Sequence, residues 1–237
     1  MGPILVKESL GLSLRSLRFH QCRLDAADLA QLLRCCQQLE RLDCCGEALA
    51  GFGRELRGDA DAPGAIELPR GLRSAELTDC GLLADDAAAI FERLGGSLEA
   101  CHLQASDLRG LRLSPQQQLG CLRRLSLLDC GLGRSEAAAL MGQCPSVEIL
   151  ELCGNDLAVG IDGSGGSDSG DGSDGEEPAA WPAMPCLQRG DFRGCGLGAA
   201  EERRLRESLG GQGAEILVAR NGDVGAQRQH IVFEDSV

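Results

Sequence analysis

The sequence predicts an α/β solenoid, a curved stack in which short parallel strands form the concave side and helices form the convex side. Three observations lead to this fold class. A motif of eleven residues recurs eight times, and its apolar positions alternate as in a β-strand. The segments between copies, such as residues 26–36, 84–94 and 134–144, carry Ala and Leu at helical spacing.

The motif is clearest at residues 122–132, "LRRLSLLDCGL", where Leu, Leu, Leu, Cys and Leu occupy positions 1, 4, 6, 9 and 11. Further copies begin at residues 14, 72, 147 and 187, and weaker copies begin at residues 39, 98 and 214. Five of the seven spacings between these starts are 24–27 residues long. Such a period indicates a repeat architecture.

These copies resemble the L-x-x-L-x-L-x-x-N/C-x-L segment of leucine-rich repeat proteins. The resemblance covers residues 12–224 and is closest to the ribonuclease-inhibitor type, with some character of the cysteine-containing repeats. It implies a horseshoe of about eight repeats, with a parallel concave sheet and convex helices. Residues 1–11 would then form an N-terminal cap segment, and residues 225–237 a C-terminal tail.

The physics of a strand explains which residues the motif uses. Positions 4 and 6 point the same way because side chains alternate along a strand. One copy cannot bury its apolar side alone, whereas stacked copies share a continuous core. At position 9 the chain leaves the strand, and a compact polar or thiol side chain can bond backbone groups that would otherwise be buried unpaired. Cys130 is therefore predicted to be structural, in a ladder with Cys22, Cys80, Asn155 and Cys195.

Two insertions interrupt the period. The longer one contains "GIDGSGGSDSGDGSDGEE", residues 160–177, with six acidic side chains and no basic one. Because it cannot bury enough apolar surface to offset the loss of chain entropy, we expect a flexible loop, and its register does not fit a calcium-binding loop. The only tryptophan, Trp181, follows it and is predicted to pin the chain back onto the convex side. A smaller irregular insertion lies at residues 57–71.

Composition and charge exclude several classes of function. The formal net charge of −13 disfavours nucleic-acid binding, because phosphate contacts need clustered Lys and Arg, and equally disfavours an anionic membrane surface. No stretch approaches the roughly 18 apolar residues that a membrane-spanning helix needs, and no secretory signal is visible. The thirteen cysteines are odd in number and include no C-x-x-C pair. They predict reduced thiols, no metal site and a cytoplasmic or nuclear location.

Catalytic signatures are largely absent from the sequence. The three histidines, His20, His102 and His230, lie far apart along the chain, and no His-x-x-x-His pair, nucleophile elbow or phosphate-binding loop is present. We therefore expect no enzymatic activity, no catalytic residues and no cofactor.

The remaining candidate site is the outward face of the strands, where positions 3, 5 and 7 of each copy line the concave wall. An acidic row beside a broken basic one can recognise a partner through its charge pattern, although the same charges could merely keep the sheet hydrated. The candidate partner-binding residues, all expected to point to solvent, are Arg18, Arg41, Asp43, Glu76, His102, Arg124, Glu151, Arg189, Asp191 and Arg193.

These features favour a non-catalytic interaction scaffold that binds a protein partner, whose identity the sequence leaves open together with the oligomeric state. The alternative is a regulator of an enzyme, such as a GTPase activator similar to the Ran-directed leucine-rich repeat family. That family resembles this chain in repeat type, but it commonly carries its acidic segment after the repeats, whereas the acidic segment here is internal.

The first testable prediction concerns the acidic insertion. Deleting residues 162–176 should leave the thermal midpoint within a few degrees of the full chain, because closing a long flexible loop costs only slightly more than closing a short one. Thermal unfolding followed by circular dichroism measures this. A large loss of stability would mean that the segment packs against the fold or binds an ion.

Overall fold

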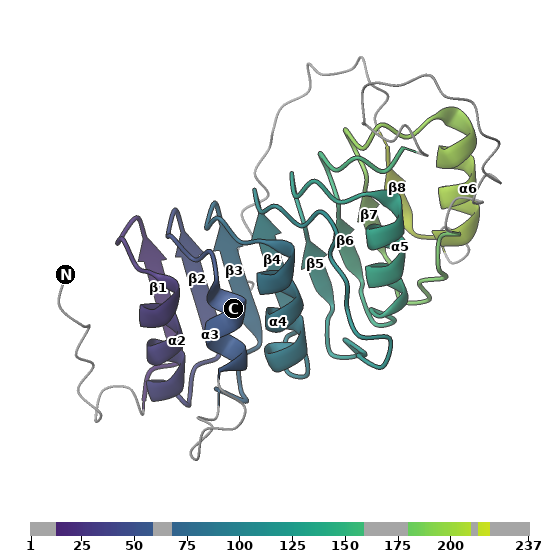
Figure 1. Ribbon diagram of the computed structural model, residues 1–237. Helices are drawn as coiled ribbons and strands as arrows, with labels where there is room; N and C mark the ends of the chain where they lie inside the picture. Colours follow the sequence, from purple (N-terminus) through teal and green to yellow (C-terminus); the bar gives the residue numbers. More distant parts are fainter. Residues whose placement is uncertain (1–12, 59–67, 159–179, 210–212, 219–237) are drawn as a thin grey trace, which may run out of the picture.

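The chain forms one parallel β-sheet with helices on one of its faces (Figure 1). The computed structural model describes residues 13–58, 68–158, 180–209 and 213–218. Within them the eight strands follow one another in chain order from β1 to β8, and every neighbouring pair is parallel. This α/β arrangement is consistent with the curved solenoid that the sequence predicts.

Each strand lies within one copy of the motif, at its third to seventh positions. The strands are β1 (Ser16–His20), β2 (Arg41–Cys45), β3 (Ser74–Thr78), β4 (Ala100–Gln104), β5 (Arg124–Ser126), β6 (Ile149–Glu151), β7 (Arg189–Asp191) and β8 (Glu215–Leu217). The helices are α2 (Ala26–Cys35), α3 (Phe52–Arg57), α4 (Ala84–Leu94), α5 (Arg134–Gly142) and α6 (Ala199–Leu209). The helices predicted near residues 26–36, 84–94 and 134–144 are therefore confirmed.

The core lies between the sheet and the helices, where the apolar motif positions meet. Leu125 and Leu127, at positions 4 and 6 of their copy, are 1% and 0% exposed. Leu122 and Leu132, at positions 1 and 11, are buried as well. The alternation seen in the sequence thus separates a buried side of the sheet from an outward side, which we call the open strand face.

Two carboxylates accept backbone N–H groups at the starts of the helices α2, α3 and α4. Asp25 precedes α2, and its side chain accepts a hydrogen bond from the backbone N–H of Asp28 at 2.9 Å, as a helix N-cap does. Asp86 in the first turn of α4 is only 3% exposed, and it accepts N–H groups from Gly53 at 2.8 Å and from Leu83 at 3.0 Å. Asp86 therefore joins the start of α3 to the start of α4.

The register of β8 differs by one residue from the register that the sequence predicts. The motif pattern predicts that the eighth copy begins at residue 214, which would turn Ile216 outward. In the structure Ile216 pairs with Gly190 and is 6% exposed, while Glu215 pairs with Arg189. The eighth copy therefore begins at residue 213. Because side chains alternate along a strand, a slip of one residue exchanges the buried and outward sets.

A left-handed turn follows each strand from β1 to β7. The residue at position 8 has a φ between +52° and +74° in seven copies, namely in Gln21, Gly46, Asp79, Ala105, Asp129, Gly154 and Gly194. This turn directs the next residue, position 9, back toward the core. A side chain at Gly154 would also collide with the side chain of Asp129, so the close approach of two copies adds a second reason for glycine there.

Position 9 joins each copy to the one before it. Asn155 Nδ2 donates to the carbonyl oxygen of Leu127 at 2.6 Å. Asn155 Oδ1 accepts the backbone N–H groups of Cys130 at 3.1 Å and Leu132 at 3.0 Å. One side chain thus satisfies a buried carbonyl at position 6 and two buried N–H groups at positions 9 and 11 of the preceding copy.

The cysteines at position 9 make the same bond to the preceding copy. Burial raises the pKa of the Cys130 thiol to about 11, although a hydrogen bond from the backbone of Ser106 opposes the shift. The thiol therefore stays protonated at neutral pH and can donate. Three thiols donate to the position-6 carbonyl before them: Cys80 to Cys44 at 3.3 Å, Cys130 to Leu103 at 2.8 Å and Cys195 to Leu152 at 2.9 Å. The predicted structural role of Cys130 is confirmed.

In three copies the position-9 side chain does not make this bond to the preceding copy. Glu47 is 4% exposed, and its carboxylate accepts the N–H groups of Cys22 at 2.6 Å and Leu24 at 2.7 Å, as the Asn155 amide oxygen does in its own copy. The buried hydroxyl of Ser106 has no hydrogen-bond partner. Cys22 is exposed, since no described copy precedes it.

Trp181 anchors the chain after the acidic insertion, as the sequence predicts. It is 6% exposed and packs edge-to-face on Phe192, with ring centroids 6.3 Å apart. The guanidinium of Arg134, at the start of α5, lies 5.0 Å from the Trp181 ring and 3.3 Å from the carboxylate of Glu201 in α6. The predicted cap segment 1–11, the insertion 160–177 and the tail 225–237 lie outside the described residues.

The second prediction tests position 9. Cys130→Leu should lower the free energy of unfolding by about 1–3 kcal/mol, because it leaves the Leu103 carbonyl without its buried donor. Cys130→Asn should cost clearly less, because Asn155 makes the equivalent bond in the next copy. Urea unfolding measures both variants. The exposed Cys121→Leu serves as control, expected within about 0.5 kcal/mol of wild type; equal losses in the two Cys130 variants would contradict the ladder.

Candidate functional site

The structure places most of the predicted site residues in one row across the open strand face. Strand register sets the position-5 residues side by side, in the order Arg18, Asp43, Glu76, His102, Ser126, Glu151, Asp191 and Leu217. We call this set the position-5 row. Because neighbouring strands lie about 4.8 Å apart, the row is continuous across the sheet.

The N-terminal part of the row is accessible to a partner. The side chain of Arg18 is 81% exposed and forms an ion pair of 2.6 Å with Asp43, which is 30% exposed. Glu76 and His102 follow on β3 and β4 and are partly exposed. Arg41 and Arg124, at position 3 of β2 and β5, are exposed as well. Together they form a polar surface across five strands.

In the C-terminal part of the row, the exposure of the side chains differs from the sequence prediction. Glu151 and Asp191, expected to point to solvent, are 7% and 2% exposed, and Ser126 is 3% exposed. The guanidinium of Arg193 folds back onto Asp191, with Nε and Nη2 donating at 2.9 and 2.7 Å. Glu151 lies between Ser126 and Asp191 in register, so neighbouring strands flank it on both sides. Glu151 and Asp191 therefore leave the set of accessible binding residues.

Asp191 is held as a carboxylate in this buried position. Burial raises its pKa, but hydrogen bonds from Arg193 and from the Cys153 thiol outweigh burial, and the pKa lies below its ordinary value of 3.8. Burial and the neighbouring carboxylate raise the pKa of Cys153 to about 12. At neutral pH the group is therefore a thiol, a carboxylate and a guanidinium in a fixed structural arrangement, and none of the three is poised to exchange a proton.

The two remaining predicted residues also lie in this C-terminal part. Arg193 retains 42% exposure of its side chain while paired with Asp191. Arg189 is 37% exposed, and its Nε lies 4.0 Å from the carboxylate of Glu215 on β8. Both arginines thus belong to ion pairs within the sheet.

A second charged row lies outside the set of site residues predicted from the sequence. It occupies position 2, just before each strand, and its signs alternate along the sheet through Arg15, Glu40, Arg73, Glu99, Arg123 and Glu148. Three ion pairs join neighbours in it, at 2.6 Å for Arg15–Glu40, 3.2 Å for Arg73–Glu99 and 3.4 Å for Arg123–Glu148. Comparing position 2 across all copies of the motif would have revealed it. We call it the position-2 row.

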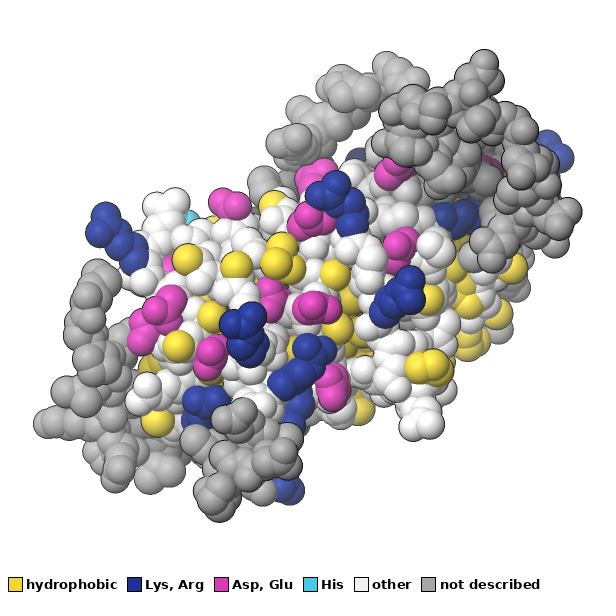
Figure 2. Space-filling view, in the orientation of Figure 1, with side chains coloured by type: hydrophobic (Ala, Val, Ile, Leu, Met, Phe, Trp, Pro, Cys, Tyr) yellow, Lys and Arg dark blue, Asp and Glu magenta, His cyan; other side chains and the backbone are white. Residues whose placement is uncertain are grey.

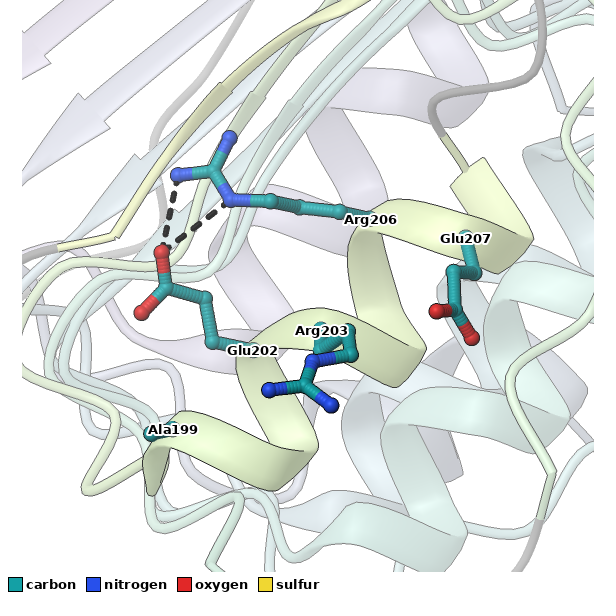
Figure 3. Close-up of a pocket in the computed structure, with 5 residues that line it drawn as sticks. All are labelled: Ala199, Glu202, Arg203, Arg206 and Glu207. Carbon is teal, nitrogen blue, oxygen red and sulfur yellow. Dashed lines mark hydrogen bonds and ion pairs between the residues drawn. The ribbon is translucent and has the colours of Figure 1, made fainter.

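Other parts of the described chain offer no converging chemistry. A hollow on α6 is lined by residues of that helix alone. Arg206 Nη2 lies 3.0 Å from Glu202 Oε1 in an ion pair. Arg203 and Glu207 lie apart from this pair (Figure 3). Acidic and basic side chains are interspersed over the N-terminal helices (Figure 2). Among the described residues no three His, Cys, Asp or Glu side chains are grouped as a metal site, and no helix is long and apolar enough to span a membrane.

The third prediction concerns Asp191. Asp191→Asn should lower the free energy of unfolding at pH 7 by about 1–3 kcal/mol, because Arg193 loses its charged acceptor. The folded-state pKa of Asp191 is depressed, so its contribution is complete above the unfolded-state pKa and is lost as the pH falls through the folded value. The difference between wild type and variant should therefore persist from pH 5 to 8 and close below about pH 4.

Urea unfolding at a series of pH values measures this difference. The exposed Asp156→Asn is the control and should stay within about 0.5 kcal/mol of wild type throughout. An Asp191 variant as stable as wild type at pH 7 would show that the ion pair with Arg193 contributes nothing.

Comparisons with known proteins supply no family for this chain. No protein-family model matches it, and no curated protein sequence matches it. Its function is therefore argued from the motif and from the surfaces described above.

Proposed function

We propose that the chain is a non-catalytic scaffold of the leucine-rich repeat class that binds a protein partner on its open strand face. In this proposal its eight motif copies are about eight repeats of a horseshoe of the ribonuclease-inhibitor type, and it acts in the cytoplasm or nucleus. The parallel sheet with helices on one face supports the class of fold. The recurring position-9 bonds between copies also support it.

One observation carries the proposed binding surface. The accessible residues of the position-5 row, Arg18, Asp43, Glu76 and His102, lie on four consecutive strands in register. Such a rigid charged surface is built on strands rather than on loops, so its side chains are positioned before a partner arrives. A preorganised surface of this kind binds without an ordering cost of its own, and its charges select the partner and its orientation.

The charge pattern indicates what the partner presents. Two neighbouring carboxylates, Asp43 and Glu76, form an acidic centre, and the guanidinium of Arg18 flanks it on β1. Arg41 and Arg124 lie at position 3 on either side of the small residues Ser74 and Ala100. A partner surface with a basic centre and acidic margins complements this arrangement.

The fourth prediction tests this surface. Partners are captured from native cells and identified, and the affinity of the purified partner is then measured for wild type and for the double variant Asp43→Lys, Glu76→Lys. The variant should bind at least tenfold more weakly, because like charges now face each other across the interface. Wild-type binding should also weaken with salt, since exposed charges are screened beyond roughly 8 Å at physiological ionic strength.

The matched control reverses the same number of charges away from the sheet. Glu92 on α4 and Glu207 on α6 are exposed, so Glu92→Lys, Glu207→Lys should bind like wild type. Circular dichroism confirms folding of both variants. Undiminished binding by a folded Asp43→Lys, Glu76→Lys variant would move the site away from the open strand face. Faster GTP hydrolysis by a panel of small GTPases on adding the chain would instead favour the enzyme-regulator alternative.

A further inference from the structure

We propose that the position-2 row ensures that each of the strands β1 to β6 pairs with its true neighbour when the sheet assembles. This role concerns folding and uses none of the residues assigned to partner binding. The row consists of six consecutive members whose signs alternate without exception: Arg15, Glu40, Arg73, Glu99, Arg123 and Glu148. Neighbouring members are therefore always opposite in charge, and members two copies apart are always alike.

The backbone holds these six residues in a continuous line. Each one donates its backbone N–H to the carbonyl oxygen of the member before it at 2.8 Å, from Glu40 on Arg15 to Glu148 on Arg123. Adjacent members are thus hydrogen-bonded neighbours at the start of their strands. Gln188 continues the line with the same backbone bond to Glu148, and its side-chain amide donates to the Glu148 carboxylate at 3.4 Å.

The position-2 row contributes more to the selection of the correct neighbouring strand than to the stability of the folded chain. Side chains in its three ion pairs are 38–71% exposed. Exposed pairs of this kind stabilise a folded protein only slightly. Like charges placed directly opposite one another on adjacent strands are destabilising by comparable amounts, so the difference between a correct and an incorrect neighbour is about twice the value of one pair. Several members acting together multiply that difference.

The apolar core cannot make this distinction by itself. Inward positions in different copies carry similar residues, for example Leu77, Leu103 and Leu127 at position 6. A strand could therefore dock on the copy after next and still bury its apolar side, and such misassembly is a characteristic failure of repeat proteins. In that arrangement Arg15 would face Arg73, and Glu40 would face Glu99. The position-2 row opposes this error along the six strands from β1 to β6.

Three variants of the full chain separate selectivity from stability. The exchange variant Glu40→Arg, Arg73→Glu creates two like-charged neighbour pairs and makes three skipped pairings attractive: 15 with 73, 40 with 99 and 73 with 123. The single variant Glu40→Arg also creates two like-charged neighbour pairs, but it makes only one skipped pairing attractive, 40 with 99, and keeps positions 15 and 73 alike. The inverted variant reverses all six signs and preserves alternation and net charge: Arg15→Glu, Glu40→Arg, Arg73→Glu, Glu99→Arg, Arg123→Glu and Glu148→Arg.

Refolding from urea at low salt is followed by fluorescence of Trp181, and the yield of native monomer is measured by size-exclusion chromatography. The exchange and single variants should have similar urea midpoints, since each contains two repulsive neighbour pairs. Compared with the single variant, the exchange variant should refold with a monomer yield lower by about twofold or more and with an added slow phase, because three attractive skipped pairings compete instead of one. The inverted variant should refold like wild type.

Salt supplies the second measurement. At 1 M salt the screening length falls to about 3 Å, so the exchange variant should regain the wild-type yield. This holds even if that variant does not fold at low salt. Equal yields and kinetics for the exchange and single variants would overturn the proposal, as would an inverted variant that refolds no better than the exchange variant.

Discussion

The stack depends on how the backbone is satisfied where each strand ends. At that point the chain turns inward through a left-handed residue, and it takes two N–H groups and one carbonyl away from water. The bonds these groups need come from the position-9 side chain of the following copy. Asn155 supplies all three for the copy before it, Glu47 supplies two acceptors, and Cys130 supplies a donor from a thiol that burial keeps protonated. Where these bonds form, a copy depends on its successor to complete its hydrogen bonding, so successive copies stabilise one another.

This dependence also accounts for the composition of the chain. Seven of the thirteen cysteines are fully buried, where a thiol is small enough for the core and polar enough to donate to a carbonyl. Cys44 and Cys101 illustrate the first property at apolar strand positions, and Cys80 and Cys195 illustrate the second at position 9. A thiol whose pKa is raised well above neutrality is a poor nucleophile, so the abundance of cysteine here reflects packing.

The same kind of charged residue has different consequences in different rows of the sheet. At position 5, Asp43 is accessible and belongs to a surface that can meet a partner, whereas Asp191 is closed off by Arg193 two residues later. At position 2 the charges face one another along the line of copies. Positions 2 and 5 are three residues apart on one strand, or about 10 Å, so the two rows can act independently. In the two roles proposed above, the charge on this sheet serves the order of the strands as well as recognition.

The sequence by itself determined the strand positions, the helices at α2, α4 and α5, the inward residues such as Leu125 and Leu127, and the role of Cys130. These features repeat with the motif, and each follows from the local geometry of a strand and a turn. It could not decide which outward residues are accessible, because exposure depends on neighbours that a single copy does not specify. Ile216 turning inward on β8 and the pairing of the position-2 charges both required adjacent strands to be set in register. The guanidinium of Arg193 closes over Asp191 within one copy, in a side-chain conformation that only the structure shows. The periodic pattern determines the class of fold, whereas the candidate site is decided only when the strands are placed side by side.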